Sequence, residues 1–189
     1  MMEKSPPSNP QTASDLFDEM LVVMAQRGDR LALERLYRRW NARLTRTARR
    51  YCGQDCTAQD LAQECWLAIL KGLGGLRDPK RFRSYAFAVL HRRGADHLRK
   101  VMRERGSAGD PGEESTMPPQ SESAAIAQAF ASLPPDQRLA AHLYFIEGLT
   151  LGEIAAVQSI PEGTAKSRLF HARRKLKAAL SDTNKGVTQ

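Results

Sequence analysis

Hydrophobic positions recur at intervals of three and four residues along most of the chain, and this spacing predicts helices. From about Ser14 the first two apolar stripes are Leu16, Met20, Val23 and Met24, and then Leu33, Leu36, Tyr37, Trp40, Leu44, Ala48 and Tyr51. Gly28 and Asp29 separate these stripes as a helix stop and an N-cap. Because period-two strand patterns and hairpin dipeptides are missing from the sequence, the first half of the chain is predicted to be all-helical.

Two more helices are predicted before residue 106. Thr57 can cap a third helix, which the glycines after residue 71 bring to an end. Its inward positions are Leu61, Cys65, Ala68 and Ile69. A fourth helix is predicted to start at the pair Asp78 and Pro79, a cap followed by a first-turn proline, and to run to about Arg103. Its inward stripe is Phe82, Tyr85, Ala86, Val89, Leu90 and Leu98.

Polar segments rich in proline, glycine and serine divide the chain. Residues 106–123 combine these residues with four acidic side chains and contain no Lys or Arg, which predicts a flexible linker. Residues 1–13 and 182–189 are predicted to be disordered tails. We therefore expect an all-α protein with two small helical domains, 14–105 and 124–181.

The second domain begins with two helices. One is predicted from Ala124 until the pair Pro134 and Pro135, and the next from Asp136 until Gly148. Their buried positions are expected to be Ile126, Phe130, Leu133, Leu139, Leu143 and Ile146.

Two capping boxes then predict a short helix over 151–157 and a long one over 161–180. The pairs are Thr150 with Glu153 and Ser159 with Glu162. A short helix, a tight turn and a longer basic helix form the helix-turn-helix arrangement.

Charge narrows the class of partner. The net charge of +8 favours a polyanion, although charge alone does not separate DNA, RNA, the ribosome and a membrane surface. The sequence contains neither an apolar run of membrane-spanning length nor a signal-peptide core, so a cytoplasmic protein without membrane insertion is expected. Three clustered cysteines, Cys52, Cys56 and Cys65, are interpreted as buried or half-buried thiols in preference to a redox sensor.

The last predicted helix has one apolar and one basic face. The apolar stripe is Ala165, Leu169, Ala172, Leu176, Ala179 and Leu180. The opposite face and its flanks carry Thr164, Lys166, Ser167, Arg168, Phe170, His171, Arg173, Arg174 and Lys177. A solvated charged face is the simpler interpretation, but the turn ahead of this helix favours DNA binding. Side chains near its N-terminus would read base edges in the major groove, and later Arg and Lys side chains would hold phosphates.

The third and fourth predicted helices have opposite charge. Basic side chains of the fourth, Arg92, Arg93, Arg99 and Lys100, suit single-stranded nucleic acid. Phe82 and Tyr85 are either core residues or stacking platforms for bases. The third helix contains DLAQECWL, in which an exposed Trp66 beside Asp60, Gln63 and Glu64 would indicate a protein partner. The alternative is that Trp66 packs against the core of its own domain.

Three stretches resemble RNA polymerase sigma factors. DLAQECWL resembles conserved region two-point-two of that family, and FRSYAFAVLHRRGADHLRK resembles the segment after it that melts and recognises the minus-ten element. The block LPPDQRLAAHLYFIEGLTLGEIAAVQSIPEGTAKSRLFHARRKLKAAL is similar to region four, most specifically over IPEGTAKSRLFHARRKL. Regions one and three have no counterpart, which implies the extracytoplasmic-function group.

The resemblance implies partners and residue roles. Core RNA polymerase would contact Asp60, Gln63, Glu64 and Trp66 through the clamp helices of its largest subunit. Minus-ten promoter DNA would contact Arg92, Arg93, Asp96, Arg99 and Lys100, and the loop 72–78 would capture a flipped base. Minus-thirty-five DNA would contact Thr164, Lys166, Ser167, Arg168, Phe170, His171, Arg173 and Arg174. An anti-sigma factor is a further implied partner. Arg92 and Tyr85 depart from the Asn and Trp that many members carry.

Two other classes of function are considered. One is a helix-turn-helix regulator that binds duplex DNA without core polymerase, its first domain sensing a ligand or dimerising. The other is an enzyme, but the four histidines are scattered and neither a metal-spaced cluster, a nucleophile motif nor a glycine-rich phosphate loop occurs in the sequence. We therefore expect no catalytic residues, no cofactor and no metal.

Overall fold

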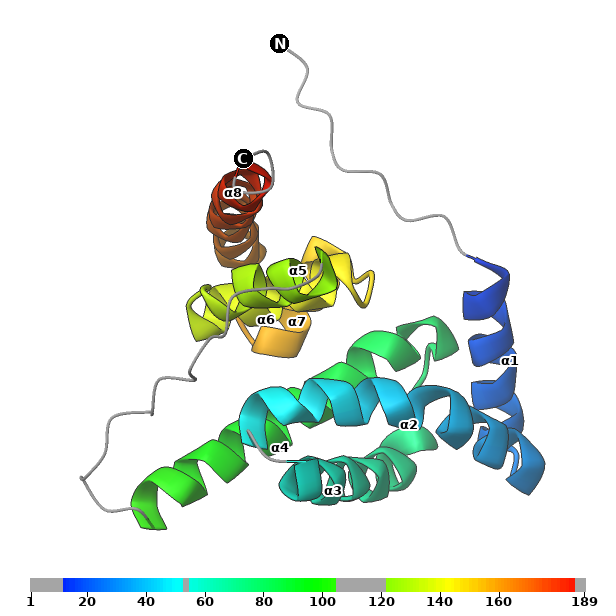
Figure 1. The fold of residues 1–189 in the computed structure, drawn as a ribbon. Coiled ribbons are helices and arrows are strands. Elements are labelled where there is room, and N and C mark those ends of the chain that lie inside the picture. Colours follow the sequence, from blue (N-terminus) through cyan, green and yellow to red (C-terminus); the bar gives the residue numbers. More distant parts are fainter. Residues whose placement is uncertain (1–11, 53–54, 105–121, 186–189) are drawn as a thin grey trace. The chain divides into compact units, whose positions relative to one another are not determined.

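The computed structural model describes residues 12–52, 55–104 and 122–185, and it divides the chain into two compact units, Met1–Ala108 and Gly109–Gln189 (Figure 1). Within the described ranges the regular elements are all helices, which confirms the expected all-α class. The predicted linker up to residue 121 and the predicted tail up to residue 11 lie outside the described residues.

Over its described residues, the first unit contains four α-helices and a short 3-10 helix. They are α1 (Ala13–Gln26), α2 (Arg30–Cys52), α3 (Asp55–Leu73), η1 (Pro79–Arg81) and α4 (Phe82–Glu104). The predicted cap at Asp29 is confirmed, since its Oδ1 accepts from the backbone N–H groups of Leu31 and Ala32 at 2.9 and 3.0 Å. Asp78 caps η1 in the same way, accepting from the N–H of Lys80 at 3.1 Å.

The starts of two helices in this unit, α1 and α3, differ from the predicted starts. The start of α1 has a capping box between Thr12 and Asp15, and Thr12 had been predicted to lie in the N-terminal tail. The third helix begins at Asp55, so Thr57 lies inside its first turn and the predicted cap there is wrong.

Helix α2 is the centre of the first unit and packs against α1, α3 and α4. Its Trp40 is 1% exposed and meets Phe82 edge-on at 5.1 Å and Phe87 at 6.0 Å between ring centroids. Truncating a buried aromatic side chain lowers the free energy of unfolding by about 3–5 kcal/mol. These three rings therefore contribute much of the stability of the contact between α4 and α2.

The apolar stripe of α1 faces outward, unlike the stripes of the other helices in this unit. Leu16, Met20 and Met24 are 54%, 46% and 37% exposed, whereas the neighbouring Leu21 and Val22 are buried. Ion pairs supplement this narrow apolar contact. Asp18 accepts from Arg39 of α2 at 2.7 Å, and Asp15 is paired with Arg83 of α4.

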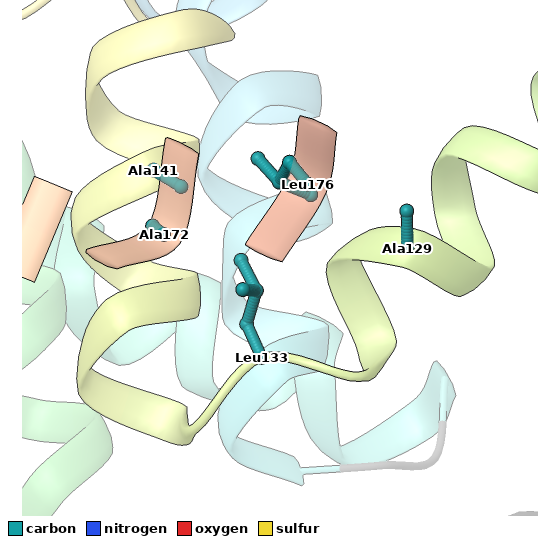
Figure 2. Packing of buried hydrophobic residues seen from close by; sticks show 5 residues of the cluster. All are labelled: Ala129, Leu133, Ala141, Ala172 and Leu176. Atoms are coloured by element: carbon teal, nitrogen blue, oxygen red, sulfur yellow. The ribbon is translucent and has the colours of Figure 1, made fainter. Parts of the chain in front are cut away.

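The second unit contains α5 (Glu122–Ala131), α6 (Pro135–Phe145), α7 (Leu151–Gln158) and α8 (Glu162–Lys185). Figure 2 shows part of its core, in which α8 packs against α5 and α6 through small and branched side chains. These are Ala129, Leu133, Ala141, Ala172 and Leu176. The alanines let the helix backbones approach closely, so α8 is held along its length.

Of the two capping boxes predicted here, one is confirmed and one is wrong. Glu153 Oε2 accepts from the N–H of Thr150 at 2.8 Å, and Thr150 Oγ1 accepts from the N–H of Glu153 at 3.3 Å. Ser159 instead ends α7 in the left-handed conformation, with φ at +54°. The helix that follows begins at Glu162, three residues on, too far for Ser159 to cap it.

Apolar residues at helix ends were predicted to be buried and are not. Leu98, Ile146 and Leu180 are 39%, 51% and 40% exposed. After Gly94 the described side chains of α4 include none in the buried class, because this end of the helix extends past α2 and α3 (Figure 1). The backbone of α8 also stays helical to Lys185, into the predicted tail.

We predict that Gly94→Ala destabilises the first unit. A Cβ atom at Gly94 would lie 2.4 Å from the ring of Tyr51, whose hydroxyl is fixed 2.9 Å from His91 Nδ1 and cannot swing away freely. The free energy of unfolding should fall by about 1–3 kcal/mol despite the better helix propensity of alanine. Urea unfolding followed by the fluorescence of Trp40 and Trp66 measures this unit alone, because both tryptophans of the chain lie in it.

Gly74→Ala is the matched control for this measurement. A Cβ there would meet no atom within 4 Å, so we expect a change within about 0.5 kcal/mol. Equal stability of the two variants would show that the contact between Gly94 and Tyr51 does not limit the packing of α4 on α2.

Candidate nucleic-acid and partner-protein interfaces

One face of α3 is acidic and exposed. Asp60, Gln63 and Glu64, spaced as neighbours on a helix, are all exposed. Leu67 continues the same face one turn further and is 61% exposed, with Leu70 beside it at 41%. Exposed leucines next to carboxylate and amide groups have the composition of a protein-binding surface. The sequence signal for Leu67, its position four residues after Gln63, had been missed.

The expectation that Trp66 is exposed on this face is wrong. Its side chain is 4% exposed and packs on Tyr37 of α2, with ring centroids 5.0 Å apart and planes at 53°. Two residues beyond Glu64, a helix has turned by about 200°, so Trp66 faces α2 while Glu64 faces outward. Its buried Nε1 has no hydrogen-bond partner within the described residues.

A polar groove of about 460 Å³ lies between α2 and α3 and shares Gln63 with the acidic face. Its lining residues are Tyr37, Asn41, Ala42, Thr45, Arg46, Arg49, Gln59 and Gln63. The two arginines place positive charge beside the carboxylates of α3. A partner that covers both would need basic groups opposite Asp60 and Glu64 and acidic groups opposite the groove.

The basic residues predicted on α4 are exposed on one side of the helix. Arg92, Arg93, Arg99 and Lys100 lie within about two turns, and Asp96 between them is ion-paired with Arg99. Phe82 is a core residue, 1% exposed, so it offers no stacking platform. Tyr85 is half-buried, its hydroxyl donates to the carbonyl of Ile69 at 3.4 Å, and burial raises its pKa.

The basic face of α8 is exposed along the helix. Thr164, Lys166, Ser167, Phe170, His171, Arg173 and Arg174 are all in the exposed class. Phe170 is 62% exposed and its ring meets that of His171 at 5.5 Å. Leaving a phenylalanine in water on a rigid helix forgoes its burial, roughly 1.5–3 kcal/mol, which favours a role in contact with a ligand.

Arg168 differs from its neighbours on α8. It is half-buried, and its guanidinium donates to Asp136 of α6 at 2.6 Å and to Gln158 of α7 at 2.9 Å. It therefore ties the start of α8 to both preceding helices. These bonds use one N–H on each of its two terminal nitrogens, and they orient the start of the basic face.

A buried ionisable pair holds the turn between α6 and α7. His142 and Glu147 are each 2% exposed, and His142 Nε2 lies 3.4 Å from Glu147 Oε1. Gly148, which follows, has φ at +72°, a conformation that glycine adopts without strain. Sequence reasoning had used Gly148 only as a stop signal and had not found the pair, since ionisable residues at a helix end are ordinarily exposed.

The two described cysteines agree with the interpretation as buried or half-buried thiols. Cys52 is half-buried, and Cys65 is buried, which raises its thiol pKa to about 12. A buried thiol of that pKa is protonated at neutral pH and reacts slowly. The side chain of Cys56 lies outside the described residues. Among those described, His, Cys, Asp and Glu form no cluster of three that could hold a metal ion.

Comparison with known families gives two adjacent matches. A family model described as Sigma-70 region 2 matches residues 36–104, and one described as Sigma-70, region 4 matches residues 123–176.

Curated relatives match over nearly their full length. The RNA polymerase sigma-H factor of Pseudomonas aeruginosa is 29% identical over 182 residues, which cover 86% of this chain and 93% of the relative. The ECF RNA polymerase sigma factor SigM of Mycobacterium tuberculosis is 30% identical over 172 residues, 90% of this chain and 88% of the relative.

Two solved structures share the fold. CnrH, in complex with the cytosolic domain of CnrY, has a TM-score of 0.63 at 25% identity, covering 88% of this chain and 98% of CnrH. The sigma factor RpoE of Bartonella quintana, solved with the anti-sigma factor NepR, also has a TM-score of 0.63, at 21% identity over 79% of this chain and 96% of RpoE. The second likeness concerns the fold alone.

Region 2 and region 4, each on its own helical unit, are the parts with which sigma factors direct transcription initiation by core RNA polymerase. The chain belongs to the sigma-70 family, in its extracytoplasmic-function (ECF) group. This confirms the sigma-factor interpretation over a helix-turn-helix regulator that works without core polymerase. In the described part of the chain, no helix has both the length and the apolar character needed to cross a bilayer.

We predict that Arg168→Ala loosens the second unit, whereas Arg174→Ala does not. Removing Arg168 breaks the links to Asp136 and Gln158, and because Asp136 is 67% exposed we expect a loss of only about 1 kcal/mol. Arg174 is exposed and should change stability by less than about 0.5 kcal/mol. Hydrogen exchange of α8 amides measures both; equal protection in the two variants would contradict the orienting role of Arg168.

Proposed function

We propose that this sigma factor binds core polymerase through the exposed face of α3 formed by Asp60, Gln63, Glu64 and Leu67. The partner would be the clamp helices of the largest polymerase subunit. The observation that carries this proposal is an acidic face, continued by the exposed Leu67, on a protein of net charge +8. Such a face repels DNA and suits a basic protein surface with an apolar contact beside it. Trp66 would act from beneath, by holding α3 on α2.

We propose that α4 contacts the minus-ten element. Arg92, Arg93, Arg99 and Lys100 would hold the phosphates of the opened strand, and Asp96 would orient Arg99 through their ion pair. Of the predicted loop 72–78, residues 74–78 follow the end of α3 and would receive an unstacked base. Their two glycines leave the backbone open to a close approach.

We propose that α8 reads the minus-thirty-five element in the major groove. Lys166, Ser167 and Phe170 lie on its exposed face within the first turns, where side chains reach base edges. Phosphate contacts would come from Thr164 near the N-terminus and from His171, Arg173 and Arg174 further along.

The same proposal covers organisation and partners. Residues 14–105 would form the polymerase and minus-ten domain and 124–181 the minus-thirty-five domain, joined by the linker 106–123. A protein inhibitor of the anti-sigma class would hold the factor inactive, as NepR is bound to the sigma factor of similar fold. The factor would act in the cytoplasm, without cofactor, and all catalysis would be that of the polymerase.

Reversing the charge of the α3 face should abolish core binding. We expect Asp60→Lys and Glu64→Lys together to lower the affinity for core RNA polymerase roughly a hundredfold, because each puts a cation against a basic partner surface. Binding of labelled protein to core polymerase, followed by run-off transcription from a selected promoter library, measures the loss.

Glu34→Lys is the matched control for one of these changes, since Glu34 is an exposed glutamate on α2 of the same unit. It should alter the affinity less than about twofold. If Glu34→Lys and Glu64→Lys lowered the affinity for core polymerase equally, the effect would be due to net charge, and α3 would not be the docking face.

Substitutions on α8 should distinguish residues that contact bases from residues that contact phosphates. Lys166→Ala or Phe170→Ala should weaken binding to the preferred upstream box by about 1–3 kcal/mol and reduce the preference for particular base pairs. Arg174→Ala should weaken binding to all sequences alike. It should also reduce the slope of log affinity against log salt concentration by roughly one. Holoenzyme binding to randomised upstream boxes at several salt concentrations gives both quantities. An unchanged base preference in the first two variants would mean that another element reads this box.

A further inference from the structure

The last residue of α1 reaches across to the loop that follows α3. Gln26 Nε2 donates to the carbonyl of Leu73 at 2.8 Å and to the carbonyl of Leu76 at 2.8 Å. An amide NH₂ group has two protons, so each carbonyl receives one. The two acceptors stand on either side of Gly74 and Gly75, and a single side chain therefore clamps both ends of this turn.

The turn has few other restraints of its own. Its backbone bonds run from the N–H of Gly75 to the carbonyl of Gly72 and from the N–H of Leu76 to the carbonyl of Leu73, both at 3.1 Å. At Gly74 no atom lies within 4 Å of where a Cβ would stand, so side-chain packing does not fix it there. Leu73 is buried at the start of the turn, so Gln26 adds the contact that joins this anchored end to Leu76 across the two glycines.

Gln26 is itself on a firmly anchored helix. The ion pair of Asp18 with Arg39 attaches α1 to α2, and that of Asp15 with Arg83 attaches it to α4. Asp18 is 7% exposed, so the first pair is shielded from water on the carboxylate side. The polar tethers of α1 thus connect it to α2, to α4 and to the turn, although its apolar stripe is exposed.

We propose that Gln26 is a positioning residue for promoter opening. It holds the backbone of residues 73–76 in the conformation that accepts an unstacked base. The loop therefore loses its conformational entropy on folding and not on DNA binding. This inference rests on the proposed function, in which the loop 74–78 receives that base. Gln26 needs no contact with DNA or polymerase for this role.

The test uses the full chain bound to core RNA polymerase on a promoter selected with the unaltered protein. Gln26→Leu removes both donors at similar volume, and Gln26→Glu places a carboxylate against two carbonyls. Each should lower the equilibrium fraction of opened promoter about tenfold, as read by permanganate reactivity of unpaired thymines, since two hydrogen bonds of ordinary net strength are lost. Affinity for core polymerase and for the upstream box should stay within twofold. Gln26→Lys, whose ammonium donates again, should recover most of the opening.

Asp18→Asn is the matched control, because it loosens α1 from α2 without touching the turn. If Asp18→Asn and Gln26→Leu lost opening equally at equal loss of stability, or if Gln26→Leu opened promoters normally, the proposal would be overturned. Arg93→Ala tests the underlying function separately. Normal opening in Arg93→Ala together with normal opening in Gln26→Leu would overturn the minus-ten interface as well, whereas a defect in Arg93→Ala alone would overturn only the role of Gln26.

Discussion

Aromatic contacts on two adjacent sides of α2 determine where the functional faces of the first unit point. Tyr37 meets Trp66 of α3 at 5.0 Å, and Trp40, one turn on, meets Phe82 of α4 at 5.1 Å. Each contact fixes the rotation of a helix about its own axis, because a buried ring fits only one orientation well. With Trp66 turned inward, the carboxylates of α3 must face outward.

This packing leaves the charged residues of α3 and of α4 exposed on one small domain. The acidic residues of α3 and the basic residues of α4 are attached to the same central helix, yet each set is exposed. Had they paired with each other, both the repulsion of DNA by α3 and the attraction of phosphates by α4 would be cancelled. Ion pairs attach α1 to α2 and α4, and the hydrogen bonds of Gln26 attach it to the turn after α3.

Sequence reasoning succeeded where a local signal decides the structure and failed where tertiary contacts decide it. Asp29 and the Thr150–Glu153 pair were identified as caps because their hydrogen bonds are made within three residues. The stripe of α1 has helical periodicity, but periodicity does not tell which face meets a neighbour. The burial of Trp66 depended on Tyr37, 29 positions earlier in the sequence, and the bonds of Gln26 to Leu73 and Leu76 lie beyond any local pattern.

The second unit shows how a small domain keeps an apolar side chain exposed on a fixed helix. The buried residues of α8 are two alanines and two leucines, and the close approach at the alanines limits how far α8 can shift or rotate. Arg168 fixes the start of α8 to α6 and α7, and the buried pair of His142 and Glu147 fixes the turn between those two helices. A mobile helix could fold Phe170 back onto the domain and recover its burial. Held in this way, α8 keeps Phe170 in water until a partner surface covers it, so the rigidity of the core is what makes the exposed ring available for recognition.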